Sequence, residues 1–216
     1  MNRWWWLTIG FICWMAVGFA AFRRQECRGD SESAQGIRAE RIVSMAPSLT
    51  EILFALGLDE EIVGVTLFSD YPPAAAEKPK VGGFWQPNIE AVVAARPNLV
   101  ITLGFGQQKD LAERLKRIGY NTLAVNIEEE KVSDLFPAIR QVAAATGRQR
   151  QADELVAGIK DKLNALSALV AALPKVKVLW VVQRHPLRVA GRDTFVNEMI
   201  ELAGGENAIG PTLHKY

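Results

Sequence analysis

The sequence predicts an α/β fold of two Rossmann-like lobes that are joined by a long backbone helix. From residue 41 onward, short apolar runs alternate with helical patterns, which is typical of a mainly parallel sheet covered by helices. The stretch from Gln149 to Leu173 keeps apolar side chains at helical spacing and contains no proline, so it predicts one long helix. The sequence EILFALG at 51–57 matches EMIELAG at 198–204 in layout, which indicates a second lobe of the same type after that helix.

The composition argues against several classes of protein. The 216 residues carry a net charge of +1 with both signs interspersed, so nothing indicates a nucleic-acid partner. Both cysteines, Cys13 and Cys27, lie near the N-terminus, and they can therefore neither staple the globular part nor hold a metal there. His185 and His214 are the only histidines, which argues against a His-rich metal site. We therefore expect no bound metal and no cofactor.

Residues 4–22 form an uncharged segment. A helix over these residues is about 28 Å long, close to the hydrocarbon thickness of a bilayer. Two interpretations remain: an export signal cleaved near Ala21, and an uncleaved membrane anchor, which the tryptophans at 4–6 favour. We assign residues 1–24 to this signal or anchor and the polar residues 25–40 to a flexible linker. Either interpretation places the protein in the periplasm or on the outer face of the cytoplasmic membrane.

The N-terminal α/β lobe is expected to span residues 41–147. Its first helix is predicted to begin with the capping box Ser48-Leu-Thr-Glu51 and to end at Gly57. Asn88 is expected to cap a short helix that stops before Pro97. The apolar run 99–103 has the length of a strand buried on both faces. The predicted elements in order are strand 41–45, helix 48–57, strand 62–66, helix 88–96, strand 99–103, helix 107–118, strand 122–127 and helix 131–145.

The rest of the chain is divided into an inter-lobe helix at 148–174 and the start of a C-terminal α/β lobe at 175–216. Pro174 ends the helix, and residues 176–182 have the pattern of another buried strand. Residues 194–202 predict a helix that ends at Gly204. Because the second lobe is much shorter than the first, we expect it to be incomplete.

Three aromatic residues lie in turns rather than in helices or strands. Tyr71, Phe84 and Trp85 are flanked by prolines and glycines at 72, 73, 82, 83 and 87. Such segments run over the surface, so these side chains either cap the local core or form a wall that faces a ligand. Open α/β sheets bind ligands beyond the carboxyl ends of their strands. The candidate site therefore also includes the residues that follow strands, which are Pro47, Ser48 and Phe105 in the first lobe and Gln183 and Arg184 in the second.

No sequence pattern indicates catalysis. Gly104-Phe-Gly106 after a strand is similar to the start of a dinucleotide-binding loop, but Lys109 stands where the third glycine is required. No nucleophile elbow, P-loop or HExxH pattern occurs. We therefore expect a binding protein and not an enzyme.

Four segments carry a resemblance to a known family, and they occur in order between Arg41 and Gly210: RIVSMAPSLTEILFALG, SDYPP, GGFWQPNIEAVVAARPNLVI and ELAGGENAIG. Together they resemble the substrate-binding proteins of ATP-binding-cassette (ABC) importers for cobalamin and iron complexes, most of all the cobalamin-binding branch. The resemblance implies two lobes that hold a ligand in a shallow cleft. It also implies that Tyr71 and Trp85 contact the ligand and that Glu90 docks on arginines of the permease. The chain departs from this family in its short second lobe and in a slightly shorter segment between Trp85 and Glu90.

Two classes of function remain open. The first is an extracytoplasmic protein, expected to be a monomer, that delivers cobalamin to the permease and ATPase subunits of an importer. A ferric siderophore or haem is the alternative ligand, for which Arg184 would meet an anionic group. The second class is a cofactor-dependent enzyme or an anchored sensor that uses the same lobe. A sensor needs a cytoplasmic part, and only residues 1–3 precede the hydrophobic segment, so we favour transport.

Overall fold

The computed structural model describes residues 39–127 and 131–210 of the chain. All of these residues belong to one of the chain's two compact units, Ile37–Tyr216. The predicted signal or anchor, and all but the last two positions of the predicted linker, lie outside the described residues. Among the helices of the described part, none has the length and apolar character needed to cross a membrane.

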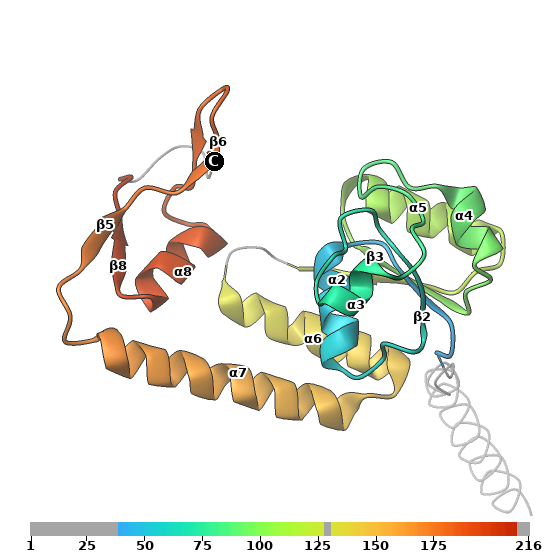
Figure 1. Ribbon diagram of the computed structural model, residues 1–216, viewed down its shortest axis with the longest axis horizontal. Coiled ribbons are helices and arrows are strands. Elements are labelled where there is room, and N and C mark those ends of the chain that lie inside the picture. The colour runs from blue at the N-terminus through green and yellow to red at the C-terminus, as the bar shows by residue number, and fades with distance from the viewer. Residues whose placement is uncertain (1–38, 128–130, 211–216) are drawn as a thin grey trace, which may run out of the picture. The chain divides into compact units, whose positions relative to one another are not determined.

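A four-stranded parallel sheet in the order β2-β1-β3-β4 forms the centre of the first lobe (Figure 1). Every residue of β1 and β3, the two central strands, is buried. The prediction of a mainly parallel sheet is thus confirmed. The strands are β1 (Ile42–Ser44), β2 (Ile62–Val65), β3 (Leu99–Leu103) and β4 (Thr122–Val125).

The alternation of side chains along the strands divides the core of this lobe into two layers. Ile42 and Ile101 belong to the larger cluster, which contains side chains of α2 and α6. Val43 and Val100, their neighbours in sequence, belong to a second cluster with side chains of α4 and α5. The helices of the lobe are α2 (Pro47–Ala55), α3 (Pro73–Ala76), α4 (Ile89–Ala94), α5 (Gly106–Arg117), the 3-10 turn η2 (Val132–Asp134) and α6 (Leu135–Thr146).

Two predicted helix starts have different outcomes. The prediction of a capping box at Ser48 is wrong. The helix α2 begins at Pro47, and its N-cap is Ala46, which makes no side-chain hydrogen bond to the helix. Proline is favoured in the first turn of a helix, and its place at 47 moves Ser48 into that turn. The prediction that Asn88 caps α4 is confirmed, since its Oδ1 accepts the Ala91 N–H at 3.0 Å.

The predicted long helix is present as α7 (Gln149–Val170), which contains 22 residues. It ends three residues earlier than expected, ahead of Pro174. Gly147 adopts the left-handed conformation, with φ of 71°, between α6 and α7. Arg148 then forms an ion pair of 2.9 Å with Glu61, which ties the start of α7 to the first lobe.

Up to residue 210, where the described part of the chain ends, the second lobe contains two separate strand pairs and one helix. β5 (Val176–Val178) pairs in parallel with β8 (Gly205–Asn207), and β6 (Val181–Gln183) pairs in antiparallel fashion with β7 (Arg188–Val189). The helix α8 (Phe195–Leu202) was predicted, and Thr194 caps it by accepting the Asn197 N–H.

The prediction of a single buried strand over residues 176–182 is wrong. The segment forms two short strands, and Val176, Val181 and Val182 are exposed. The physical reason is that a two-stranded pair buries little apolar surface, so a valine-rich sequence alone does not bury these strands. The residue limits predicted for the lobes and for the helix between them stay a prediction.

Candidate ligand-binding site

Aromatic side chains from two loops meet on the first lobe. The rings of Phe84 and Trp85 pack edge to face with centroids 4.7 Å apart, and the Phe105 ring lies 6.5 Å from that of Phe84. Phe84 and Trp85 precede α4, whereas Phe105 lies between β3 and α5. The buried Gln108 side chain, in the first turn of α5, donates a hydrogen bond to the Phe84 carbonyl oxygen. The two loops are therefore joined by ring contacts and by one buried polar side chain.

Exposure separates the two interpretations of the aromatic residues. Phe84 is half-buried and packs against the main core cluster, as a residue that caps the core does. Tyr71 and Trp85 are each 65% exposed, so they do not cap the core. A large aromatic side chain that stays exposed on a well-packed lobe is typical of a surface that meets a partner or ligand.

Two further exposed apolar residues, Leu67 and Phe68, lie on the loop that carries Tyr71, and sequence reasoning missed them. Phe68 is 73% exposed and Leu67 is 54% exposed. The Leu67 N–H donates to the Gly82 carbonyl oxygen at 2.9 Å, which joins this loop to the segment that leads to Trp85. Their position directly after the strand predicted at 62–66 was the available signal.

The start of α2 and two loops thus bring candidate residues to the carboxyl edge of the parallel sheet. Pro47 and Ser48 follow β1, Tyr71 lies in the loop after β2, and Phe105 follows β3. Ser48 is exposed and Pro47 is half-buried. In parallel sheets this edge is the usual place for a ligand. The ligand-binding role of these residues stays a prediction.

Gln183 and Arg184 occupy a different setting. Both are exposed on the β6–β7 hairpin, where the Gln183 side-chain amide donates to the His185 carbonyl oxygen at 2.6 Å. Among residues 39–127 and 131–210, no hydrogen bond or ion pair links either side chain to the aromatic residues of the first lobe. Their contribution to a ligand site stays a prediction.

Glu90 lies in the first turn of α4, and its side chain is exposed. It has no hydrogen-bond or ion-pair partner within the described part of the chain. Glu198 lies in the first turn of α8, two positions further along than Glu90 in α4, and its carboxylate accepts the backbone N–H of Val132. Of these two first-turn acids, Glu90 is thus the one that is available to a partner protein.

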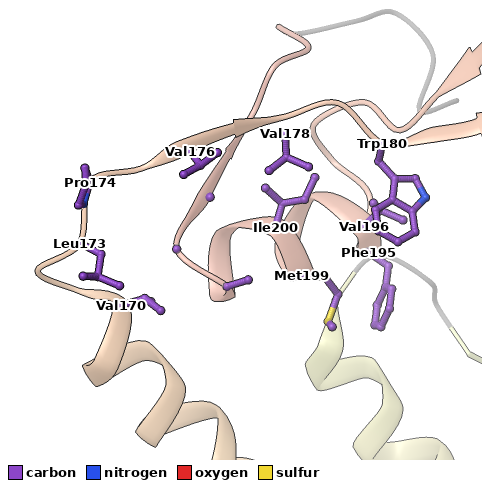
Figure 2. Close-up of a pocket in the computed structure, with 13 residues that line it drawn as sticks. Val170, Leu173, Pro174, Val176, Val178, Trp180, Phe195, Val196, Met199 and Ile200 are labelled. Atoms are coloured by element: carbon purple, nitrogen blue, oxygen red, sulfur yellow. The ribbon is translucent and has the colours of Figure 1, made fainter.

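A cavity of about 570 Å³ lies on the second lobe, where Val178 of β5 is directed towards Ile200 of α8 (Figure 2). None of the predicted ligand residues lines it. Its wall is apolar and holds no charged side chain, so it offers few groups that could orient a polar chelate. We therefore interpret it as an uncovered part of the lobe's core. It is lined by Val170, Leu173, Pro174, Val176, Val178, Trp180, Phe195, Val196, Met199, Ile200, Ala203, Gly204 and Gly205.

Metal ligands do not gather in the part of the chain that the structure describes. No group of three or more His, Cys, Asp or Glu side chains there is close enough together to hold an ion. The aromatic surface itself offers flat apolar contact and the exposed phenol group of Tyr71.

Comparison with known proteins gives a consistent assignment of family. The family model described as periplasmic binding protein matches residues 42–215. The chain is 33% identical over 175 residues to YvrC of Bacillus subtilis (strain 168), named an uncharacterized ABC transporter substrate-binding lipoprotein, with 78% of this chain and 55% of YvrC covered. It is 28% identical over 181 residues to the vitamin B12-binding protein of Vibrio parahaemolyticus, with 82% of this chain and 64% of that protein covered.

A solved structure supports the same fold. The periplasmic haem-binding protein RhuT from Roseiflexus sp. RS-1, in its apo form, is similar with a TM-score of 0.70 and 32% identity. The match covers 79% of this chain and 66% of RhuT. The chain spans 55% and 64% of the length of the two curated relatives. All three names describe binding proteins, which agrees with the prediction that the chain is not an enzyme and carries no cofactor of its own.

Proposed function

The chain belongs to the periplasmic binding protein family, and on this premise we propose that it is the extracytoplasmic substrate-binding component of an ABC importer. We propose cobalamin, or a related corrinoid, as its ligand. Two relatives support this proposal, because one is named an ABC transporter substrate-binding lipoprotein and the other a vitamin B12-binding protein.

The exposed aromatic surface of the first lobe is the observation that carries the proposal. Tyr71 and Trp85 are 65% exposed beside the carboxyl ends of parallel strands. A corrin ring is broad and nearly flat, and exposed aromatic rings offer it a large contact area at little cost in side-chain entropy. Phe84 supports this surface from below, since it packs against both Trp85 and the core.

Haem is the second candidate ligand, and two observations favour it. RhuT, which is 32% identical to this chain, is named a haem-binding protein. Tyr71 also presents a phenol at the exposed surface, and a tyrosine oxygen is one of the groups that can bind haem iron. The flat aromatic surface suits either macrocycle, so the phenol oxygen is the feature that separates the two ligands.

Substitution of this oxygen distinguishes the two ligands. Wild-type protein and Tyr71→Phe are dialysed against cyanocobalamin, haemin and a ferric siderophore, and bound ligand is measured from its absorption spectrum. For a corrinoid-binding protein we expect both to bind cyanocobalamin with equal affinity, because Phe keeps the flat ring. For a haem-binding protein, Tyr71→Phe loses the iron–phenolate band and most of its affinity for haemin. Binding of none of the three by the wild type contradicts the proposed transport function.

The partners and the location follow from the same proposal. Glu90 meets arginines of the permease, and the ATPase subunits act with that permease. The chain works as a monomer on the outer face of the cytoplasmic membrane or in the periplasm, held or exported by residues 4–22. Intact-mass measurement of membrane and soluble fractions tests the anchor, which a soluble form beginning near Ala21 would contradict.

A further inference from the structure

Four buried hydroxyl groups anchor the loop at residues 66–72, which we call the Tyr71 loop. They belong to Ser44 at the end of β1, Thr50 on α2, and Thr66 and Ser69 in the loop itself, and none is more than 1% exposed. Thr50 Oγ1 lies 2.8 Å from Ser44 Oγ and 3.2 Å from Ser69 Oγ. Ser69 Oγ lies 2.8 Å from Thr66 Oγ1. The row of hydroxyls therefore connects the first strand and helix of the lobe to this loop.

Ser69 is held by its backbone as well. Its N–H donates to the Thr66 carbonyl oxygen at 3.0 Å. Its own carbonyl oxygen accepts a hydrogen bond of 2.9 Å from Lys80 Nζ, which also donates to the carbonyl oxygen of Ala75 at 3.3 Å. Every polar group of Ser69 is thus engaged, while Tyr71, two residues further on, extends its ring into solvent.

A row of hydroxyls in the core restricts the loop more than apolar packing would. Alanine or valine would fill a similar space without a requirement for partners, whereas each buried hydroxyl must find a hydrogen bond of suitable length and direction. Such bonds are stronger in a dry interior than in water, and they specify one arrangement of the groups that they join. Here the hydrogen bonds between the hydroxyls specify the conformation of the Tyr71 loop around Ser69.

We infer that Ser69 is a positioning residue for the ligand, which acts by fixing Tyr71 in its binding orientation through the hydroxyls of Thr50 and Thr66. This inference rests on the proposed function. A loop that is already ordered in the free protein loses little conformational entropy when the ligand binds, and the affinity is higher for that reason. Ser69 itself, which is 1% exposed, does not touch the ligand.

Dissociation constants of full-length variants for cyanocobalamin and for haemin, measured by dialysis at 25 °C, test the inference. Ser69→Ala removes the central hydroxyl, and Thr50→Val removes its neighbour while it keeps the shape of the side chain. We expect each to weaken binding about five- to tenfold, because each removes a hydroxyl that makes two of the contacts in the row. Thr146→Val is the matched control, because the Thr146 hydroxyl donates to the Val142 carbonyl oxygen within α6. It should leave the dissociation constant unchanged.

A double-mutant cycle separates positioning from a general loss of stability. If Ser69 acts through Tyr71, Ser69→Ala in a Tyr71→Ala background should change the affinity less than about twofold, because the contact that it positions is gone. An equal loss of affinity in both backgrounds, or no loss in the wild-type background, would overturn the inference. Circular dichroism at 25 °C establishes that each variant compared is folded.

Hydrogen exchange without ligand keeps this test independent of the proposed function. Ser69→Ala should speed amide exchange at residues 67–71 about tenfold or more, and Thr146→Val should not. If the wild type binds neither cyanocobalamin nor haemin but the exchange of Ser69→Ala rises, the ligand assignment fails and the positioning of the loop stands. Unchanged exchange at 67–71 in Ser69→Ala would overturn the positioning role whatever the ligand is.

Discussion

The two lobes contain similar strand sequences but bury them to very different degrees. The run LVITL in β3 is buried along its whole length between two layers of helices. Val176 of β5 and Val181 and Val182 of β6 are exposed, and Val178 is only half-buried, although the sequence VKVLWVV is also rich in apolar residues. An apolar run therefore indicates that a segment can form a buried strand, but burial itself depends on the elements that cover the sheet.

The two lobes also differ in the apolar surface that each presents, which is a group of exposed aromatic side chains on the first lobe and a cavity on the second. The first lobe presents a few aromatic side chains on a fully formed core, each on a loop at the edge of the sheet. The second lobe presents the apolar faces of its strands and of α8 around a cavity without charged groups. We interpret the aromatic surface of the first lobe as a binding surface. We interpret the cavity of the second lobe as a part of that lobe's apolar core that the described residues leave uncovered.

The largest expected difference between the lobes is in stability. Leu53→Ala removes a fully buried side chain from the first lobe and should lower the free energy of unfolding by about 2–5 kcal/mol. Leu179→Ala, the same change at a position 53% exposed in the second lobe, should cost less than about 1 kcal/mol. Urea unfolding followed by far-UV circular dichroism measures both. Equal losses would show that the second lobe buries Leu179 in solution.

The next largest difference concerns the ligand. Tyr71→Ala or Trp85→Ala should weaken binding of cyanocobalamin by about 1–3 kcal/mol, the size of a hot-spot residue, with little change in the melting temperature. Trp180→Ala is the matched control, because Trp180 is a half-exposed aromatic residue that lines the cavity of the second lobe. It should leave the dissociation constant unchanged. A fall in the melting temperature without a change in affinity would indicate that Tyr71 and Trp85 cap the local core and do not contact the ligand.

A smaller effect is expected from the helix caps, and it tests whether the two lobes unfold together. Asn88→Ala removes the side-chain cap of α4 and should lower the free energy of global unfolding by about 1 kcal/mol. Thr194→Ala removes the cap of α8, and there the loss should appear as faster hydrogen exchange at residues 195–207. Equal losses of global stability, without faster local exchange, would indicate that both lobes form one cooperative unit.

The smallest effect on stability is expected for the two first-turn glutamates. Glu90→Gln should cost about 0.3–1 kcal/mol through the helix dipole, yet it should slow uptake of labelled cyanocobalamin in cells that contain the permease. Glu198→Gln alters the hydrogen bond to Val132 and should leave the docking surface of the first lobe unaffected. Ligand affinity measured in parallel is the control for both. Uptake at the normal rate in Glu90→Gln would leave only the helix-start role for this residue.

Most of the first lobe could be predicted from the sequence because its local signals agree with its tertiary setting. Asn88 caps α4 as its side-chain chemistry predicts, and the run at 99–103 is a buried central strand. The prediction at Ser48 was wrong because two local preferences compete there. Pro47 favours the first turn of the helix, so Ser48, one residue later, cannot be the N-cap.

The candidate site was less predictable because exposure depends on the whole lobe. Tyr71, Phe84 and Trp85 carry the same turn signals, yet Phe84 packs against the core and the other two are exposed. The hydroxyl row that passes through Ser69 joins residues far apart in the chain, and no spacing in the sequence indicates it. The second lobe was predicted least well, because its valine-rich segment gives the same pattern as a buried strand.

Hydrogen exchange of the full chain with and without cyanocobalamin tests the central claim most directly, since one measurement reports on both lobes. Bound ligand should slow exchange at residues 67–71 and 83–86, in the loops that carry Tyr71 and Trp85, with haemin as the parallel probe. Residues 176–182 and 195–205, around the cavity of the second lobe, should then change little. Slower exchange confined to that cavity, with none in the two loops, would contradict the placement of the ligand on the first lobe.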